Sequence, residues 1–291
     1  MKRRLTPYLL PAIACLGSTS VSTGSLAAES WTQPQPPFRI FGNSYYVGSK
    51  GLSAMLVTSP QGHVLIDGDV PESVPMIAAS IKALGFRIED VKYIVNSHTH
   101  FDHAGGIPGL QKLSGATVVA SPWSAAALKR GGGDRDDPQY SPSRQFESVN
   151  KVESIADNGV LKLGPIVMTA HFSPGHTPGG TTWSWRSCEG DRCLNLVYAD
   201  SLNAIGNESY RFSSPVALKY FEDSFALFEQ LPCDIIVSAH PEASGLWEKL
   251  AKREMGNPAA LVDADGCRLY AAAAKGRWQQ RLQAERTTPG R

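Results

Sequence analysis

The sequence has no long apolar run and almost no excess of one charge. No stretch of eighteen consecutive apolar residues occurs in its 291 residues, so a transmembrane helix is not expected. Lys and Arg total 28 against 27 Asp and Glu, which excludes the strongly basic surface that binds nucleic acid or an anionic membrane. With 42% hydrophobic residues, the composition predicts a globular protein.

The first 28 residues show the order of features found in a secretory signal. Three basic residues follow Met1, an apolar stretch covers residues 9–16, and small residues ending at Ala28 offer a cleavage point. We therefore expect a mature domain over residues 29–291 in the periplasm or outside the cell. Lipidation at Cys15 is the alternative. Loss of the segment removes three basic and no acidic residues, so the net charge falls from +1 to −2.

Cysteines are few, and none has the C-x2-C spacing of a thiolate metal site. Four of the five lie in the expected mature domain, an even number that suits an oxidising compartment. Four cysteines allow three pairings. Cys188 and Cys193 flank a short turn between two strand-like stretches, so we expect a local bridge there, which leaves Cys233 to pair with Cys267.

Strand-like and helical stretches follow one another in two similar halves, which predicts an α/β fold with two sheets face to face and helices outside. Expected strands cover residues 39–46, 52–58, 63–67, 91–95, 117–120, 160–163, 166–171, 181–185, 194–199 and 234–239. Expected helices cover residues 70–84, a segment ending near 113, 122–130, 216–231, 246–255 and 259–283. Residues 131–145 are polar and without periodicity, which is typical of a functional or a disordered loop.

One segment carries four candidate metal ligands, His98-Thr99-His100-Phe101-Asp102-His103. Where the backbone is extended, alternate residues share a face, so His98, His100 and Asp102 can converge on one side. His103, one step further, can point to a neighbouring position. Imidazoles with a carboxylate and no thiolate favour zinc, with iron, manganese and copper as chemical alternatives.

The remaining ligands must come from distant segments. His176 lies among turn-forming glycines after an expected strand, and His240 ends another expected strand before Pro241. His171 lies within a strand, so we expect it to be a packed or surface histidine. A histidine-rich surface loop is the alternative for the whole set, but it would leave the spacing and the distant partners unexplained.

These motifs resemble the metallo-β-lactamase fold superfamily, and most closely the third subclass of the class B β-lactamases. The resemblance spans essentially the whole mature chain. It rests on the segment 98–103 and on five further segments: Pro37-Phe38-Arg39-Ile40, Leu65-Ile66-Asp67-Gly68, Pro174-Gly175-His176-Thr177-Pro178-Gly179, Ala199-Asp200-Ser201-Leu202 and Ala239-His240-Pro241. The cysteines at 233 and 267 match this subclass too, and the 188/193 pair matches some of its members.

The resemblance implies a four-layer αβ/βα sandwich that holds two zinc ions per chain. One ion would be bound by His98, His100 and His176, and the other by Asp102, His103 and His240. A hydroxide bridging the metals would attack the β-lactam carbonyl, and Asp102 would bind a metal and orient the hydroxide. Hydrolysis of the antibiotic would confer resistance. The protein would act as a monomer.

Several other residues match supporting positions of that family. Ser201 and Asn203 correspond to residues that bind the substrate carboxylate, although Asn203 departs from the more common Ser or Thr. Gln139 resembles a residue in the wall of the site. Asp67 resembles a buried carboxylate that steadies the ligand loop.

Two other functions remain open on sequence alone. A lactonase or a glyoxalase II-like thioesterase of the same fold would use a carboxylate that bridges the metals, and Asp200 keeps this alternative open. A non-catalytic zinc-binding protein would bind the metal without turnover.

Overall fold

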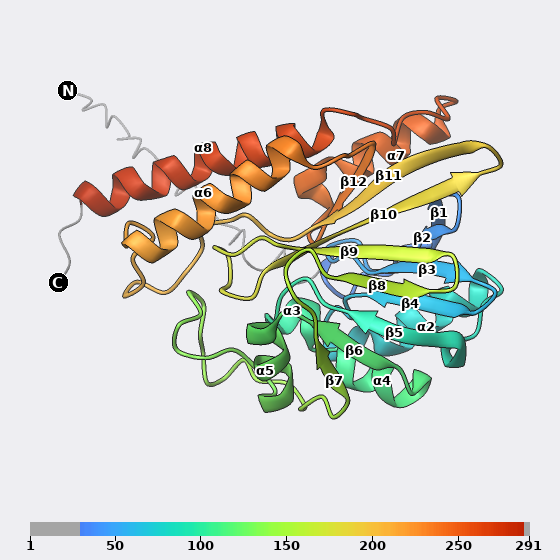
Figure 1. Ribbon diagram of the computed structural model, residues 1–291, viewed down its shortest axis with the longest axis horizontal. Helices are drawn as coiled ribbons and strands as arrows, with labels where there is room; N and C mark the ends of the chain where they lie inside the picture. The colour runs from blue at the N-terminus through green and yellow to red at the C-terminus, as the bar shows by residue number, and fades with distance from the viewer. Residues whose placement is uncertain (1–29, 288–291) are drawn as a thin grey trace, which may run out of the picture.

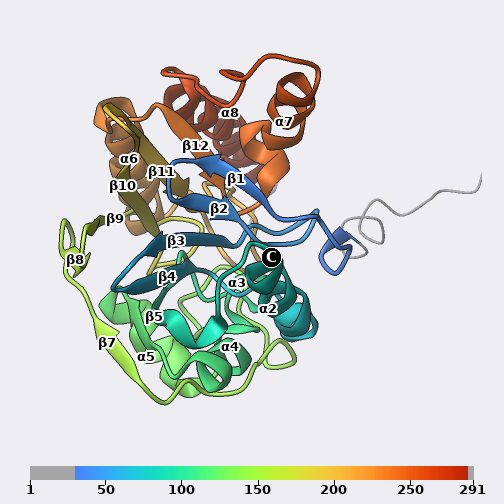
Figure 2. The same cartoon turned by 90° about the vertical axis from the view of Figure 1, so that its right-hand side faces the viewer.

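The computed structural model describes residues 30–287 of the chain. The expected signal segment 1–28, with Cys15, lies outside the described residues. Within the described part, two β-sheets pack face to face and helices cover the outer face of each (Figure 1 and Figure 2). The predicted α/β sandwich of four layers is therefore confirmed. No helix between residues 30 and 287 is long and apolar enough to cross a membrane.

The first sheet has seven strands in chain order. They are β1 (Phe38–Phe41), β2 (Ser44–Tyr46), β3 (Met55–Ser59), β4 (Gly62–Ile66), β5 (Val91–Val95), β6 (Thr117–Ala120) and β7 (Val152–Ser154). Strands β1 to β4 form an antiparallel meander, and β4 to β7 run parallel to one another.

The second sheet has five strands, in the order β12-β11-β10-β9-β8. They are β8 (Val160–Leu163), β9 (Ile166–Phe172), β10 (Thr181–Glu189), β11 (Arg192–Ala199) and β12 (Ile235–Ser238). Neighbours are antiparallel except β11 and β12, which are parallel. Strands β9, β11 and β12 therefore run in the same direction and end at the same edge.

Helices pack on both outer faces. The first sheet is covered by η1 (Pro71–Ser73), α2 (Val74–Ala83), η2 (Ile88–Asp90), α3 (Phe101–Ala104), α4 (Ile107–Ser114) and α5 (Pro122–Arg130). The second half contributes α6 (Pro215–Gln230), η3 (Pro241–Ser244), α7 (Leu246–Glu254) and α8 (Gly266–Thr287). Figure 1 shows α6 and α8 lying side by side over the second sheet.

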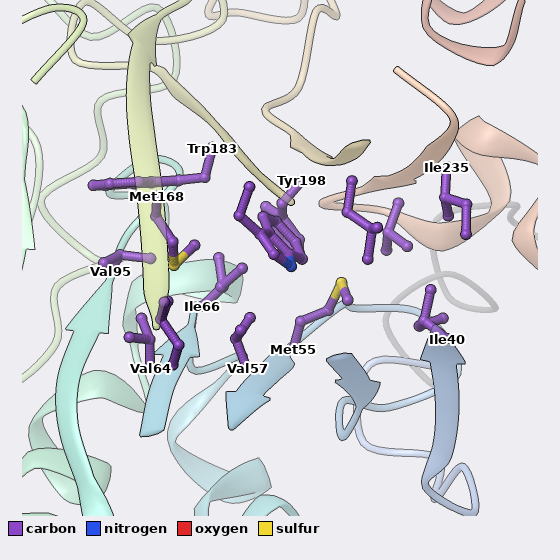
Figure 3. Close-up of a cluster of buried hydrophobic side chains, with 14 of the residues drawn as sticks. Ile40, Met55, Val57, Val64, Ile66, Val95, Met168, Trp183, Tyr198 and Ile235 are labelled. Carbon is purple, nitrogen blue, oxygen red and sulfur yellow. The ribbon is translucent and has the colours of Figure 1, made fainter. Parts of the chain in front are cut away.

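The two-residue alternation of the strands explains the layers. In β3, Met55 and Val57 point into the space between the sheets, while Leu56 packs with the helices outside. In β11, Tyr198 faces inward and Val197 faces α6 and α8. Figure 3 shows the inner layer, where side chains of both sheets interdigitate. The parts of these strands that are covered on both faces, residues 55–57 of β3 and 196–199 of β11, are continuously apolar.

Some helices and strands in the structure differ in their boundaries from those expected from the sequence. The expected strand 39–46 is a hairpin of β1 and β2, because Gly42 adopts φ +53° and turns the chain. Strand β7 was not expected from the sequence. The helix expected over 259–283 begins only at Gly266, and the one expected to end near 113 is divided into α3 and α4.

The break between α3 and α4 brings two glycines into close contact. A Cβ atom on Gly106 would lie 2.1 Å from the carbonyl oxygen of Gly68. The backbone N–H of Gly106 donates to the backbone carbonyl of Asp69 (2.9 Å), and that of Gly68 donates to the backbone carbonyl of His103 (2.9 Å). The loop after β4 is thereby held against the turn that carries Asp102 and His103.

Both expected disulfides are present. Cys188–Cys193 joins directly paired positions of β10 and β11, and Cys233–Cys267 ties the segment before β12 to the first turn of α8. The second bridge thus connects the outer helix layer to its sheet.

Candidate metal centre

The candidate ligands lie where parallel strands end. His98 and His100 follow β5, Asp102 and His103 lie in α3 directly after them, His176 follows β9, and His240 follows β12. The ends of these strands meet at one edge of the sandwich, where Thr181 donates its backbone N–H to Ser97 (2.8 Å) and joins the two sheets. The six side chains form two groups of three.

The first group consists of His98, His100 and His176. The three ring centroids lie 4.8–4.9 Å apart, and the rings are nearly perpendicular, with interplanar angles of 89°, 89° and 75°. Each ring therefore presents an edge to the other two, which is how three imidazoles surround one ion.

Each histidine of this group has its second nitrogen held by an oxygen. His98 Nδ1 lies 2.7 Å from Asp200 Oδ1, His100 Nε2 lies 3.0 Å from Asp137 Oδ1, and His176 Nδ1 lies 2.8 Å from the Asn203 carbonyl oxygen. The nitrogens left to face a metal are Nε2 of His98, Nδ1 of His100 and Nε2 of His176. His98 Nε2 is buried and has no hydrogen-bond partner.

The second group consists of Asp102, His103 and His240. Asp102 Oδ2 lies 3.3 Å from His103 Nε2 and 3.4 Å from His240 Nε2, and the two nitrogens lie 3.2 Å apart. Ligands at about 2.0–2.1 Å from a tetrahedral zinc ion lie roughly 3.3 Å from one another. The spacing of these three atoms therefore fits three corners of such a tetrahedron.

One ring of the second group is oriented by an acceptor behind it, since His240 Nδ1 lies 3.3 Å from the Gly51 carbonyl oxygen. His103 Nδ1 is buried and has no hydrogen bond, and Asp67 Oδ2 is 3.8 Å from it. Asp67 is fully buried, and its Oδ1 accepts hydrogen bonds from Asn96 Nδ2 and the Ser97 backbone N–H. Asp67 is therefore bonded to the segment directly before His98, and its carboxylate lies near the ring of His103.

The protonation states suit metal binding. Burial lowers the pKa of His98 and of His176 well below the ordinary value, so both rings are neutral near pH 7. Burial alone would raise the pKa of Asp102, but His103 and His240 outweigh it and hold that pKa well below its usual range. His98 and His176 thus offer neutral imidazoles and Asp102 an ionised carboxylate, the forms that bind a cation. Burial by itself lowers the pKa of His240, but Asp102 outweighs it and raises that pKa.

Asp200 lies behind the first group rather than between the groups. Its Oδ1 contacts Nδ1 of His98, on the opposite side of the ring from the nitrogen that faces His100 and His176. Its carboxyl group is fully buried, and burial raises its pKa well above the ordinary value. In this position Asp200 orients His98 and does not bridge two ions.

The loop between α5 and β7 forms one wall of the site. A cleft of about 250 Å³ lies between this loop and the segment 99–102, with Trp31 at its edge. Gln139 Nε2 lies 3.5 Å from both His100 Nδ1 and His176 Nε2. Asp137 Oδ1 also accepts the backbone N–H of Gln139 (2.8 Å), so one carboxylate positions both the loop and a ligand ring.

Ser201 and Asn203 lie in the loop after β11, next to the first group. Ser201 is buried directly after Asp200. Asn203 contacts His176 through its backbone carbonyl, and its side-chain Oδ1 accepts two hydrogen bonds from Arg277. The contact between Asn203 and Arg277 was not expected from the sequence.

Two histidines lie outside the centre. His171 on β9 has both ring nitrogens occupied, by Ser184 Oγ (2.8 Å) and Asn158 Oδ1 (3.2 Å). His63 packs against Phe86. The sequence reasoning missed Asp137 and Gly51, which support ligands from distant loops, because no spacing or periodicity marks them.

Comparison with known proteins shows which family the chain resembles. The family model described as "Metallo-beta-lactamase superfamily" matches residues 48–194. The structure of Rm3 metallo-beta-lactamase is 52% identical with a TM-score of 0.87, covering 90% of this chain and 98% of that chain. The structure of MEM-A1, a subclass B3 metallo-beta-lactamase from a soil metagenome library, is 49% identical with a TM-score of 0.86, covering 88% and 99%.

A curated relative carries a different activity in its name. The N-acyl homoserine lactonase AttM of Azorhizobium caulinodans is 30% identical over 153 residues, which cover 43% of this chain and 55% of the relative. The chain therefore matches only about half the length of this lactonase, whereas it matches nearly the whole of the two solved structures.

Proposed function

The chain belongs to the metallo-beta-lactamase superfamily, and on that premise we propose that it hydrolyses the amide bond of β-lactam antibiotics with two zinc ions. One observation carries the proposal beyond the family. Two groups of three ligands lie side by side, and Asp200, the candidate bridging carboxylate, is turned away behind His98.

The donor set fits zinc. Five imidazoles, one carboxylate and no thiolate make up the two groups, and three protein ligands per ion leave a position open, as in catalytic zinc sites. The unpartnered, fully buried Nε2 of His98 supports this, because a buried nitrogen without a partner is costly unless a ligand completes it. We assign one ion to His98, His100 and His176 and the other to Asp102, His103 and His240.

Zinc at such a site supplies a nucleophile at neutral pH by lowering the pKa of bound water to about 7, and it polarises a carbonyl oxygen. No serine or cysteine nucleophile is therefore required. The residues of the chain serve to hold the rings in place, to orient water and to bind the substrate.

Asp102 is the catalytic carboxylate in this proposal. Its Oδ2 faces His103 and His240, and its pKa is held well below the ordinary range, so the group stays ionised. Its Oδ1 can then accept a hydrogen bond from water and orient it. Ser201 and Asn203 would donate hydrogen bonds to the substrate carboxylate, and Gln139 would contact the substrate from the wall loop.

The lactonase and thioesterase alternative depends on a bridging carboxylate. Asp200 is the residue at the expected place, and its contact with His98 Nδ1 makes it a support for the first ligand group instead. This geometry favours β-lactam hydrolysis. A zinc-binding protein without turnover is disfavoured by the open cleft of about 250 Å³ beside His100 and Asp102.

Export is also part of the proposal. Two disulfides are typical of an oxidising compartment, which supports the periplasm or the exterior as the location. We propose residues 29–291 as the mature domain. Expression of the full chain in a susceptible bacterium would then raise the inhibitory concentration of β-lactams. A variant without residues 1–28 would not confer this resistance.

One assay tests the proposed activity. The purified mature chain is incubated with a penicillin, a cephalosporin, a carbapenem and an N-acyl homoserine lactone, with and without a chelator. We expect β-lactam turnover that the chelator abolishes and added zinc restores. Turnover of the lactone alone, or full β-lactam turnover by metal-free protein, would contradict the proposal.

A further inference from the structure

Arg277 on α8 makes an unusual contact beside the metal centre. Its Nε and Nη2 donate to the side-chain Oδ1 of Asn203 at 3.1 and 2.9 Å. The side chain of Arg277 is exposed, and among residues 30–287 no carboxylate forms an ion pair with it. The guanidinium is therefore a cation whose protein partner is a neutral amide oxygen.

The helix places this guanidinium against the loop that supports the first ligand group. Tyr270 and Arg277 are seven residues apart and share one face of α8. Tyr270 donates its hydroxyl to the Asp200 carbonyl oxygen (2.8 Å), and Arg277 donates to Asn203. The backbone carbonyl of Asn203 in turn accepts from His176 (2.8 Å). Arg277 is thus linked through Asn203 to His176, a candidate metal ligand.

Building on the proposed function, we propose that Arg277 binds the carboxylate of the β-lactam substrate together with the Asn203 amide. Nε and one N–H of Nη2 already bind the Asn203 oxygen, so the two N–H groups of Nη1 and the second N–H of Nη2 are left to bind a carboxylate through paired hydrogen bonds. A charged acceptor binds a guanidinium more strongly than a neutral amide does. Because Oδ1 of Asn203 is occupied by Arg277, its Nδ2 group is the part left to donate.

The inference also gives a reason for the amide at position 203. An amide offers an oxygen to Arg277 and an N–H to a ligand at the same time, and it holds both in one plane. The expected mature chain has a net charge of −2, so no general positive field attracts an anion. The guanidinium of Arg277, which forms no ion pair with a described carboxylate, would supply that attraction beside Asn203.

The first test compares a β-lactam with its neutral methyl ester. In Arg277→Ala we expect KM for the acid to rise about tenfold, with kcat and zinc content near those of the wild type and KM for the ester unchanged. Arg277→Lys keeps the charge but not the paired donors, so it should recover only part of the loss. Arg268→Ala is the matched control, because it removes the same charge from the same helix, where Arg268 pairs with Asp265.

Three results would overturn the inference. The first is an equal rise of KM for acid and ester. The second is an equal effect of Arg268→Ala, which would indicate a general charge effect. The third is a loss of zinc or of kcat without a change in KM, which would mean that Arg277 only supports His176.

A second measurement does not depend on β-lactam turnover. Mercaptocarboxylates of two to four carbons and the matching mercaptoalcohols are titrated into the cobalt-substituted protein, and thiolate-to-cobalt absorption reports binding. We expect the preference for the best carboxylate over its alcohol to fall about tenfold in Arg277→Ala. If β-lactams are not hydrolysed but this preference depends on Arg277, the proposed function fails and carboxylate binding by Arg277 stands. If β-lactams are hydrolysed and the preference is unchanged in the variant, the inference fails alone.

Discussion

The carboxylate of Asp200 lies directly behind the ring of His98, with Oδ1 2.7 Å from Nδ1, and both side chains are fully buried. A carboxylate in this position fixes the orientation and the tautomer of an imidazole ligand and increases its basicity. The contact also favours a β-lactam hydrolase over a lactonase or thioesterase with a bridging carboxylate. A carboxylate that bridges two metals cannot lie on the far side of a ligand ring.

Asp200→Asn should weaken zinc binding by the first group about 10–100-fold and leave the second group occupied. Zinc titration of the metal-free protein, followed by competition with a chromophoric chelator, measures both affinities. Asp223→Asn, which removes a surface carboxylate paired with Lys219, is the control. Loss of both metals together would indicate a bridging role for Asp200.

His176→Ala should remove one of the two expected zinc ions and most of the turnover, because it deletes a nitrogen of the first group. His171→Ala, five residues earlier, should keep both ions, since its ring binds Ser184 and Asn158 instead. Elemental analysis of the purified variants measures this. The reverse pattern would show that the distant ligand is misassigned.

Asp137→Ala should lower zinc affinity by about tenfold or more, because it removes the acceptor of His100 Nε2 and of the Gln139 backbone N–H. Asp136→Ala is a close control, since the neighbouring carboxylate binds only Trp123 Nε1 at the surface. Zinc titration beside steady-state kinetics would detect the difference. Equal affinities in the two variants would exclude a supporting role for Asp137.

Replacing both Ser201 and Asn203 by Ala should raise KM for a β-lactam about tenfold or more, since hydrogen bonds to a charged group contribute about 1.5–3 kcal/mol each. Zinc content should not change, because His176 binds the backbone carbonyl of residue 203, which the substitution retains. Kinetics and a melting curve measure the two effects. A lower melting temperature with an unchanged KM would mean that these residues only shape the loop.

Glu285 should stabilise the fold in a pH-dependent way. Burial by itself raises the pKa of Glu285, but hydrogen bonds from the backbone N–H groups of Phe212 and Ser213 and from Arg281 outweigh it and lower that pKa. Because the folded pKa lies below the unfolded one, the contribution is present above about pH 4.3 and is lost as the pH falls through the folded value.

Glu285→Gln should therefore lower the free energy of unfolding by about 1 kcal/mol at pH 7. The difference from the wild type should shrink below about pH 4.3. Urea unfolding across this range measures it, with the exposed Glu229→Gln on α6 as the control. A difference that does not vary with pH would contradict the assignment.

The sequence alone determined the layers and the grouping of the nearby ligands. The alternation of Met55, Leu56 and Val57 places their side chains on opposite faces of one strand whatever its neighbours are. The segment from His98 to His103 is equally local, since its spacing follows the backbone. The sequence pattern predicted one strand over residues 39–46, because a single glycine does not by itself mark a turn. Only the structure shows that Gly42 turns the chain there.

Only the tertiary structure decided which groups support the ligands. His98 meets Asp200, His100 meets Asp137, and Asn203 meets Arg277 across 102, 37 and 74 residues of the chain. These contacts depend on how strand ends and a helix face converge at one edge of the sandwich, and neither propensity nor periodicity encodes the direction in which a loop side chain points. For the same reason, Asp200 could be read from the sequence as a bridging ligand, whereas its position behind an imidazole required the packing of both sheets.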